Sequence, residues 1–228
     1  MGLAKATSDP RPRRRGRGRP AEGDFDTRDA LLRAAHDLLI ASRGQPVPLS
    51  AMCERAGVDV AMVHYHFESR RGLMTSLFER LCLAWAHDLE SLLALEVPPR
   101  RKLEIHVSQI IRNYRRFPYT NRVMNELVTS SKPALAKRLS RNFVRPLADF
   151  YERLIAEGVA KKEFRALDPV HFFCSVIGLC EFFFAAQPLL GAAFKTEAVD
   201  GNAEAAFIRH TTALLLDGVA NHKGGNHA

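Results

Sequence analysis

The sequence lacks the residue patterns that mark several common classes of enzyme and metalloprotein. Its four cysteines, at positions 53, 82, 174 and 180, form no CxxC pair, so neither a disulfide framework nor a zinc site is predicted. It also contains no HExxH sequence, no glycine-rich phosphate loop and no nucleophile elbow. We therefore predict a protein that is not an enzyme and that requires no metal or other cofactor.

Long apolar runs are also absent. The most apolar stretch, FFCSVIGLCEFFFAA at residues 172–186, is interrupted by Glu181 and is shorter than the ~20 residues that a membrane-spanning helix needs. The N-terminal arginines are not followed by an apolar segment, so neither a secretory nor a twin-arginine signal is predicted. We expect a cytoplasmic protein with no membrane partner.

Positive charge is concentrated at the N-terminus. The net charge of the chain is +8, and residues 1–20 contain Lys5, six arginines and a single acid, Asp9. Six of the eight net charges therefore lie in this short segment, which includes RPRRRGRGRP at residues 11–20 and has no apolar periodicity. We predict that residues 1–24 form a disordered basic arm with a polyanionic partner.

Apolar residues recur at helical spacing over the rest of the chain, and no segment alternates as a β-strand does. Hydrophobic residues make up 46% of the chain, which is enough for a packed core. We predict an all-α fold of about nine helices, in which Pro146 kinks a long helix from about Pro133 to Glu157. Asp26 or Thr27 is expected to cap the first helix. The helices are expected to begin near residues 26, 49, 60, 70, 101, 120, 133, 168 and 203.

The stretch LSAMCERAGVDVAMVHYHFESRRGL, residues 49–73, predicts two short helices joined by a tight turn. Gly57 can adopt the positive φ that a sharp turn requires, and Asp59 can cap the second helix. Val63 and Phe67, four residues apart, would anchor that helix to the core. This is the arrangement of a helix-turn-helix, whose second helix enters the major groove of DNA. The first short helix and the corner are expected to pack through Met52, Cys53, Ala56 and Val58.

These residues resemble the DNA-binding domain of the tetracycline-repressor (TetR/AcrR) family. The similarity includes Met52-Cys53, AGV at 56–58, HYHF at 64–67 and ESRRGL at 68–73, and the preceding LLRAAHDLLIASRG matches the first helix of the family. Several features thus recur at the correct offsets over about 47 residues.

The sequence also departs from the family pattern at four places. His64 and Arg70 stand where the family usually has Tyr and Lys, but both can still donate to phosphate. The connector after Gly44 is one residue shorter than in many members, and Pro48 replaces a common capping Thr. We expect the latter two changes to alter the first turn of the second helix and not the fold.

The resemblance implies which residues contact DNA. Val60, Ala61 and Met62 match base-facing positions but cannot form bidentate hydrogen bonds with bases, so readout is expected to use thymine methyl groups, groove shape and the arm. Thr27 matches a phosphate-binding position at the start of the first helix. The alternative is that Tyr65 and His66 only pack against the protein. The full expected set in the folded domain is Thr27, Ser50, Val60, Ala61, Met62, His64, Tyr65, His66 and Arg70.

Within the arm, RGRP at residues 17–20 resembles the core of an AT-hook, a short extended motif that lies in A·T-rich minor grooves. Arg17 and Arg19 are therefore expected to insert into a minor groove, where the negative potential is enhanced. The alternative is a non-specific tail that only neutralises phosphates.

The resemblance also implies the organisation of the chain. It places a helix-turn-helix domain at residues 25–70, a larger helical domain for ligand binding and dimerisation at 71–222, and a tail at 223–228. The implied function is that of a homodimeric, ligand-responsive repressor that is associated with the nucleoid and binds a palindromic operator in double-stranded DNA. The alternative is a DNA-organising or division-linked protein with the same fold and without an effector.

Aromatic walls would favour a small apolar or aromatic effector. Glu181 lies within an apolar run, so it is expected either to bind a polar group of the ligand or to pair with a cation of the protein. The candidate ligand-binding residues are Trp85, Tyr114, Tyr119, Phe143, Tyr151, Phe172 and Glu181. The candidate dimer-interface residues, for which an intramolecular core is the alternative, are Leu179, Phe182, Phe183, Ala186, Phe207, Leu214 and Leu215.

Overall fold

The computed structural model describes residues 22–129, 133–194 and 200–221. Within these ranges the chain is helical, and the only β-type pairing is an isolated bridge between Phe164 and Ala220, which confirms the predicted all-α class. Residues 1–21 of the predicted arm, with Arg17 and Arg19, lie outside the described residues, whereas residues 22–24, which were also predicted to be disordered, form the start of α1. The elements are α1 (Glu22–Ala41), α2 (Leu49–Ala56), α3 (Val60–Phe67), α4 (Arg70–Ala94), α5 (Pro99–Arg116), α6 (Thr120–Val128), α7 (Pro133–Leu139), the π-helical segment η1 (Ser140–Val144), α8 (Arg145–Ala160), α9 (Pro169–Ala185), α10 (Gln187–Phe194) and α11 (Gly201–Val219).

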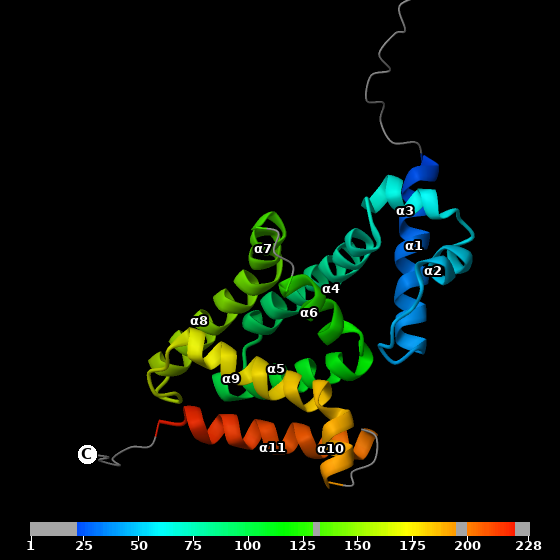
Figure 1. Ribbon diagram of the computed structural model, residues 1–228. Helices are drawn as coiled ribbons and strands as arrows, with labels where there is room; N and C mark the ends of the chain where they lie inside the picture. Colours follow the sequence, from blue (N-terminus) through cyan, green and yellow to red (C-terminus); the bar gives the residue numbers. More distant parts are fainter. Residues whose placement is uncertain (1–21, 130–132, 195–199, 222–228) are drawn as a thin grey trace, which may run out of the picture.

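Helices α1–α3 form a small unit, the head, at one end of the molecule (Figure 1). Helix α4 runs from the head into the body, where it packs against α8, and α11 packs along α5 (Figure 1). The head is therefore joined to the body by a long, continuous helix.

Two clusters of buried apolar side chains hold these parts together. The first joins the head to the first half of α4, with Leu31, Phe67 and Phe78 at or near zero exposure. It continues into Tyr119, directly before α6, and Val123 of α6. The second lies in the body between α5, α8, α9 and α11. Because the first cluster includes residues from both head and body, the two parts share a core.

The helix predicted over residues 133–157 is divided into α7, η1 and α8. Pro146 lies at the second residue of α8, and a proline cannot donate to the carbonyl group four residues earlier. The chain accommodates this with a wider turn, in which the Arg145 amide donates to the Ser140 carbonyl group, five residues back. The predicted kink is thus a π-helical turn immediately before the proline.

Helix α10 was not predicted, because Pro188 lies two residues after Ala186, where the preceding helix was expected to end. Pro188 is the second residue of α10, a position where the missing N–H has no cost. In the described part of the chain, no single helix is long and apolar enough to cross a membrane; α9 and α10 together reach that length and apolarity, but they are bent by 68°.

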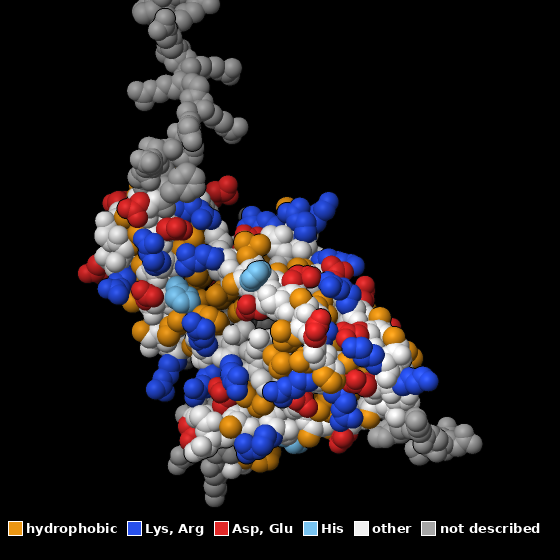
Figure 2. Space-filling view, turned by 180° about the vertical axis from the view of Figure 1, so that it is seen from behind, with side chains coloured by type: hydrophobic (Ala, Val, Ile, Leu, Met, Phe, Trp, Pro, Cys, Tyr) orange, Lys and Arg blue, Asp and Glu red, His pale blue; other side chains and the backbone are white. Residues whose placement is uncertain are grey.

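Charges of both signs are interspersed over the face of the molecule that Figure 2 shows. Many of them form exposed ion pairs, such as Arg153 with Glu90 at 2.9 Å and Arg80 with Asp29 at 3.9 Å. This mixture fits the sequence-based expectation that most of the net positive charge belongs to residues 1–20.

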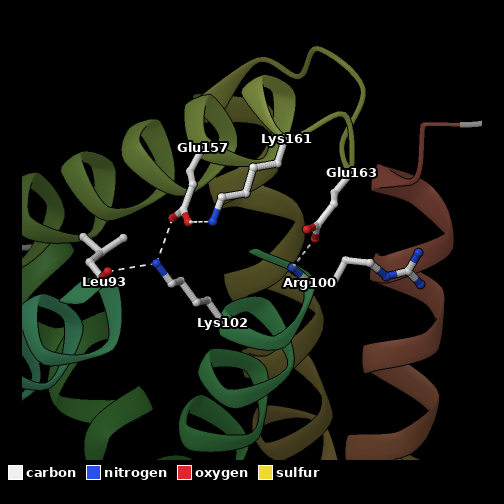
Figure 3. Close-up of polar contacts among 6 residues, drawn as sticks. All are labelled: Leu93, Arg100, Lys102, Glu157, Lys161 and Glu163. Carbon is white, nitrogen blue, oxygen red and sulfur yellow. Dashed lines mark hydrogen bonds and ion pairs between the residues drawn. The ribbon is translucent and has the colours of Figure 1, made fainter. Parts of the chain in front are cut away.

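A buried lysine of α5, Lys102, forms hydrogen bonds with α8 and with the end of α4 (Figure 3). Only 4% of the Lys102 side chain is exposed, and its Nζ donates to the Leu93 carbonyl oxygen at 2.9 Å and to Glu157 Oε2 at 2.8 Å. Lys161 Nζ donates to the other carboxylate oxygen of Glu157 at 2.7 Å. Burial raises the pKa of Glu157, but the hydrogen bonds and charges of the two lysines outweigh it, so the net pKa is lowered.

Replacing Lys102 with methionine is expected to destabilise the protein by about 2 kcal/mol at neutral pH, because the Glu157 carboxylate loses its buried partner. A carboxyl group whose pKa is lowered by folding stabilises the folded state above its unfolded pKa, and this contribution is lost as the pH falls through the folded pKa. Urea unfolding should therefore show a difference between wild type and variant that shrinks below about pH 4. The control is Lys161→Met, whose exposed i,i+4 pair should contribute about 0.5 kcal/mol or less. Equal losses for the two variants would contradict this prediction.

Candidate nucleic-acid interface and effector cavity

The turn between α2 and α3 has the predicted geometry. Gly57 adopts φ 70°, and the Val58 amide donates a hydrogen bond of 3.0 Å to the Cys53 carbonyl group. These features end α2. Asp59 caps α3, because its carboxylate accepts a hydrogen bond of 2.7 Å from the Ala61 amide. At the start of α2, Pro48 is the N-cap residue and forms no side-chain cap hydrogen bond.

Helix α3 is held to the core by one face. Val63 has no exposed surface and Phe67 has 6%, as the four-residue spacing predicted. Arg28 of α1 stacks over the Phe67 ring, with 5.3 Å between the guanidinium carbon and the ring centroid. These contacts fix which residues of α3 point outward.

The opposite face of α3 is exposed, and we call it the α3 outer face; it consists of Val60, Ala61, His64 and Tyr65. Tyr65 is 68% exposed and Val60 39%. Ser50 of α2 is also exposed, whereas Met62 and His66 are half-buried. The structure thus places four of the nine predicted DNA-contacting residues of the folded domain on one exposed face of α3.

Thr27 is not at a helix terminus. Helix α1 begins at Glu22, so Thr27 lies in its second turn, beyond the four amide groups that a helix start leaves unpaired. The expectation that Asp26 or Thr27 caps this helix is therefore wrong, because α1 already begins at Glu22, while a contact between Thr27 and phosphate stays a prediction. Asp26 instead lies 3.7 Å from Arg33.

Arg70 is the first residue of α4 and points toward α6. Its Nη1 lies 3.7 Å from Glu126 Oε2, and the side chain is only 34% exposed. Glu126 also lies 3.6 Å from Arg122 Nε, so one carboxylate lies beside two guanidinium groups. Arg70 therefore connects the junction of head and body to α6.

The body contains a cavity of about 200 Å³ between α4, α5, α6, η1, the start of α8 and α9. Four of the predicted ligand-binding residues line it: Trp85, Tyr114, Phe143 and Glu181. The Trp85 and Phe143 rings both pack edge-on against Phe78, at 6.3 and 5.3 Å, and Tyr114 stacks on Phe184 at 5.7 Å. The aromatic walls expected from the sequence are thus present.

Three predicted ligand-binding residues do not line this cavity, because each packs elsewhere. The Tyr119 hydroxyl group lies 2.8 Å from His36 Nδ1 of α1, and Tyr119 belongs to the core of the head. Tyr151 is fully buried, with its hydroxyl group 2.8 Å from His106 Nε2. Phe172 packs edge-on against the Tyr151 ring at 5.5 Å.

Several polar residues of the cavity were not predicted. Among them, His106 is buried, and burial lowers its pKa to about 3, so it is neutral at physiological pH. Burial also raises the pKa of Glu181. No local pattern marks these side chains, since polar residues on amphipathic helices usually face solvent. The unpredicted polar lining consists of Asp88, His106, Gln109, Asn113, Thr120 and Asn121.

The predicted interface residues, on or directly after α9 and on α11, fall into three groups. Leu179, Phe182 and Leu214 are exposed, at 38%, 65% and 52%. Phe183 and Phe207 are half-buried and stack on one another across the two helices, at 3.8 Å between centroids. Two of the predictions are wrong: Ala186 and Leu215 are only 5% and 6% exposed, because they face the core of their own chain.

Taken together, fold and site define an all-α protein with a helix-turn-helix head, joined by one long helix to a body that holds a ligand-sized cavity. Residues 96–225, more than half of the chain, match the family described as "Tetracyclin repressor-like, C-terminal domain". The chain belongs to the tetracycline-repressor family, and it is a DNA-binding transcriptional regulator by class. The resemblance seen in the sequence is confirmed. No curated protein sequence matches the chain.

Solved structures with the same fold include three regulators. FadR from Bacillus subtilis, in complex with stearoyl-CoA, superposes with a TM-score of 0.64 at 14% identity over 84% of this chain and 98% of its own. A TetR/AcrR regulator from Thermobifida fusca gives 0.64 at 18% identity over 85% and 98%. NalD, the secondary repressor of the MexAB-OprM efflux pump in Pseudomonas aeruginosa, gives 0.60 at 18% over 89% and 100%. At these identities the similarity shows the fold alone.

Within the described residues, no group of three or more His, Cys, Asp or Glu side chains is arranged to hold a metal ion. Family members are regulators rather than enzymes, which is consistent with the non-enzymatic role expected from the sequence.

Proposed function

We propose that the protein is a homodimeric, effector-responsive repressor that binds a palindromic operator. The observation that supports this best is the α3 outer face. It presents Val60, Ala61 and Tyr65 to solvent while Val63 and Phe67 hold the helix against the head. A short exposed helix on a fixed support has the dimensions of a major-groove reader.

The chemistry of this face indicates how it reads DNA. Valine and alanine can contact thymine methyl groups, while His64, Tyr65 and Ser50 can donate to phosphates. Few base hydrogen bonds are available, so we propose that operator choice depends on methyl contacts, on groove shape and on the arm.

A homodimer follows from the need to read two half-sites, which lie about 34 Å apart on one face of DNA. The exposed Leu179 and Phe182 of α9 and Leu214 of α11 are apolar side chains that association would remove from water. We propose that α9 and α11 form this interface, with the Phe183–Phe207 stack beside it.

Helix α6 is placed to transmit occupancy of the cavity to the head. Thr120, Asn121 and Met124 of α6 line the cavity, and Glu126 on the same helix holds Arg70. Directly before α6, Tyr119 bonds to His36 of the head. We propose that an apolar or aromatic effector shifts α6 and with it the spacing of the two heads.

Genomic footprinting with the purified chain tests the proposal. One or a few sites with two-fold symmetry, next to genes whose expression rises when the protein is removed, are the expected result. Many dispersed sites without a change in expression would instead support a DNA-organising role. Because its target is chromosomal DNA, we propose that the protein acts in the cytoplasm, on the nucleoid.

Tyr65→Ala tests the interface directly. Because Tyr65 is 68% exposed, we expect little change in the free energy of unfolding, but operator affinity should fall roughly tenfold and the salt slope by about 1 if the hydroxyl group contacts a phosphate. Fluorescence anisotropy with the footprinted operator measures both. Leu83→Ala is the control, since Leu83 is also 68% exposed but lies on α4, away from the head. Full operator affinity in the Tyr65 variant would exclude the α3 outer face as the reader.

A further inference from the structure

The cavity in the body has an unusual balance of charge. Its charged lining residues are Asp88 and Glu181, both acidic, and no lysine or arginine lines it. His106 contributes no charge at neutral pH, because burial keeps it unprotonated and its Nε2 is occupied by the Tyr151 hydroxyl group. The electrostatic potential inside is therefore negative.

Glu181 is the more buried of the two acids, and no cation among the described residues pairs with it. It lies half-buried in α9, and among the described residues its carboxylate forms neither an ion pair nor a hydrogen bond. Burial alone accounts for the raised pKa of this carboxyl group. Its negative charge also contributes to the raised pKa of Tyr114, after burial, so the two groups lie close together. Burying an ionised carboxylate among apolar side chains costs free energy, and a cationic group of a ligand would offset that cost.

The remaining walls suit the apolar part of a ligand that has a cationic end. Trp85 and Phe143 present aromatic surfaces, and Leu147 and Ile177 present aliphatic ones. Aromatic faces attract a cation within about 6 Å of the ring centre, more strongly where water is excluded. An anion would meet two carboxylates and no compensating positive charge.

We propose that the effector is a lipophilic monocation, an amine whose ammonium group pairs with Glu181 and whose apolar body lies against Trp85, Phe143 and Ile177. This inference rests on the proposed function, because it names the chemical class that the effector cavity takes. It differs from the stearoyl-CoA seen with FadR, which has several negative charges at its polar end.

Three probes that share a para-butylphenyl group but differ in charge separate the effect of charge from that of shape. They are para-butylbenzylamine, para-butylbenzyl alcohol and para-butylbenzoate. The chain has one tryptophan, Trp85, and it lines the cavity, so tryptophan-selective fluorescence reports binding at this site. At neutral pH the amine should bind at least about tenfold more tightly than the alcohol, since hydrogen bonds to charged groups contribute about 1.5–3 kcal/mol, and the benzoate should bind most weakly. Calorimetry on the same full-length chain confirms each affinity.

The variant Glu181→Gln keeps the shape and removes the charge. It should weaken the amine about tenfold, to the level of the alcohol, and leave the alcohol unchanged. Glu96→Gln is the control, because Glu96 is exposed beyond the end of α4 and does not line the cavity. The inference is overturned if the alcohol, the benzoate or stearoyl-CoA binds as tightly as the amine, if none of the probes binds, or if Glu181→Gln keeps the preference for the amine.

These titrations contain no DNA, so they are independent of the proposed regulatory role. If the amine binds through Glu181 but does not release the operator, the ligand class stands and the effector-responsive function fails. If the chain binds its operator but prefers an anion, the regulatory function stands and the ligand class fails.

Discussion

Replacing Gly44 with alanine is expected to destabilise the folded protein by about 3 kcal/mol. Gly44 lies in the turn between α1 and α2 at φ 78°, where a side chain is strained. A β-carbon there would also lie 2.6 Å from the carbonyl oxygen of Pro118 and 2.9 Å from its carbonyl carbon. Both are backbone atoms of the connector between α5 and α6, so neither can move aside as a flexible side chain would. The urea concentration at the midpoint of unfolding measures the loss.

The control is Gly57→Ala. Gly57 has nearly the same backbone conformation, with φ 70°, but nothing lies within 4 Å of a β-carbon built there. This variant should therefore show the conformational strain alone, about 1 kcal/mol. The difference between the two variants is the energy of the contact between the head and the Pro118 connector. Equal losses would mean that this contact does not constrain the head.

The same comparison tests how head and body are coupled. Gly44 packs on Pro118 and His36 bonds to Tyr119, so two adjacent residues of one connector touch the head directly before α6 begins. If this connector sets the orientation of the head, a Gly44→Ala protein that remains folded should also respond differently to an effector in operator-binding assays.

Features that depend on neighbours in the chain were predictable from the sequence. The Gly57 turn, the Asp59 cap and the buried pair Val63 and Phe67 all result from interactions within about eight residues. The helical secondary structure was equally predictable from the sequence, because the 3.6-residue period of apolar residues is a local pattern. The expected cap at Asp26 or Thr27 was wrong, since α1 begins at Glu22 and the residue directly before it, Ala21, is not one of the usual capping types.

Features that depend on distant contacts were only partly predictable. Tyr119 and Tyr151 were expected in the cavity as polar aromatic residues, but their hydroxyl groups bond to His36 and His106, which are 83 and 45 residues away in sequence. Ala186 and Leu215 lie on apolar helices, and periodicity alone does not distinguish a face toward the core from a face toward a partner. The cavity itself required the relative placement of six segments.

Deleting residues 1–20 is expected to have the largest effect on DNA binding. The deletion removes six of the eight net positive charges and leaves the described domains intact. If each charge neutralises one phosphate, the slope of log K against log salt should fall by roughly 5 per arm, since each contact adds about 0.9. Operator affinity at low salt should then fall by about a hundredfold or more. Anisotropy titrations over a series of salt concentrations measure slope and affinity together, and an unchanged slope would mean that the arm does not touch DNA.

A charge-preserving variant separates the two ways in which the arm could act. In Arg17→Lys with Arg19→Lys the net charge is unchanged, so a purely electrostatic arm should keep both its slope and its affinity. Insertion into a narrow minor groove depends on the weakly hydrated, planar guanidinium group, which lysine does not reproduce. We expect the double variant to keep its salt slope but to bind about tenfold more weakly to operators with A·T-rich flanks, and to show no such loss when the flanks are G·C-rich. Equal affinity of wild type and variant for both flanks would reduce the arm to a tail that neutralises phosphates, and the α3 outer face would then have to provide nearly all of the sequence discrimination.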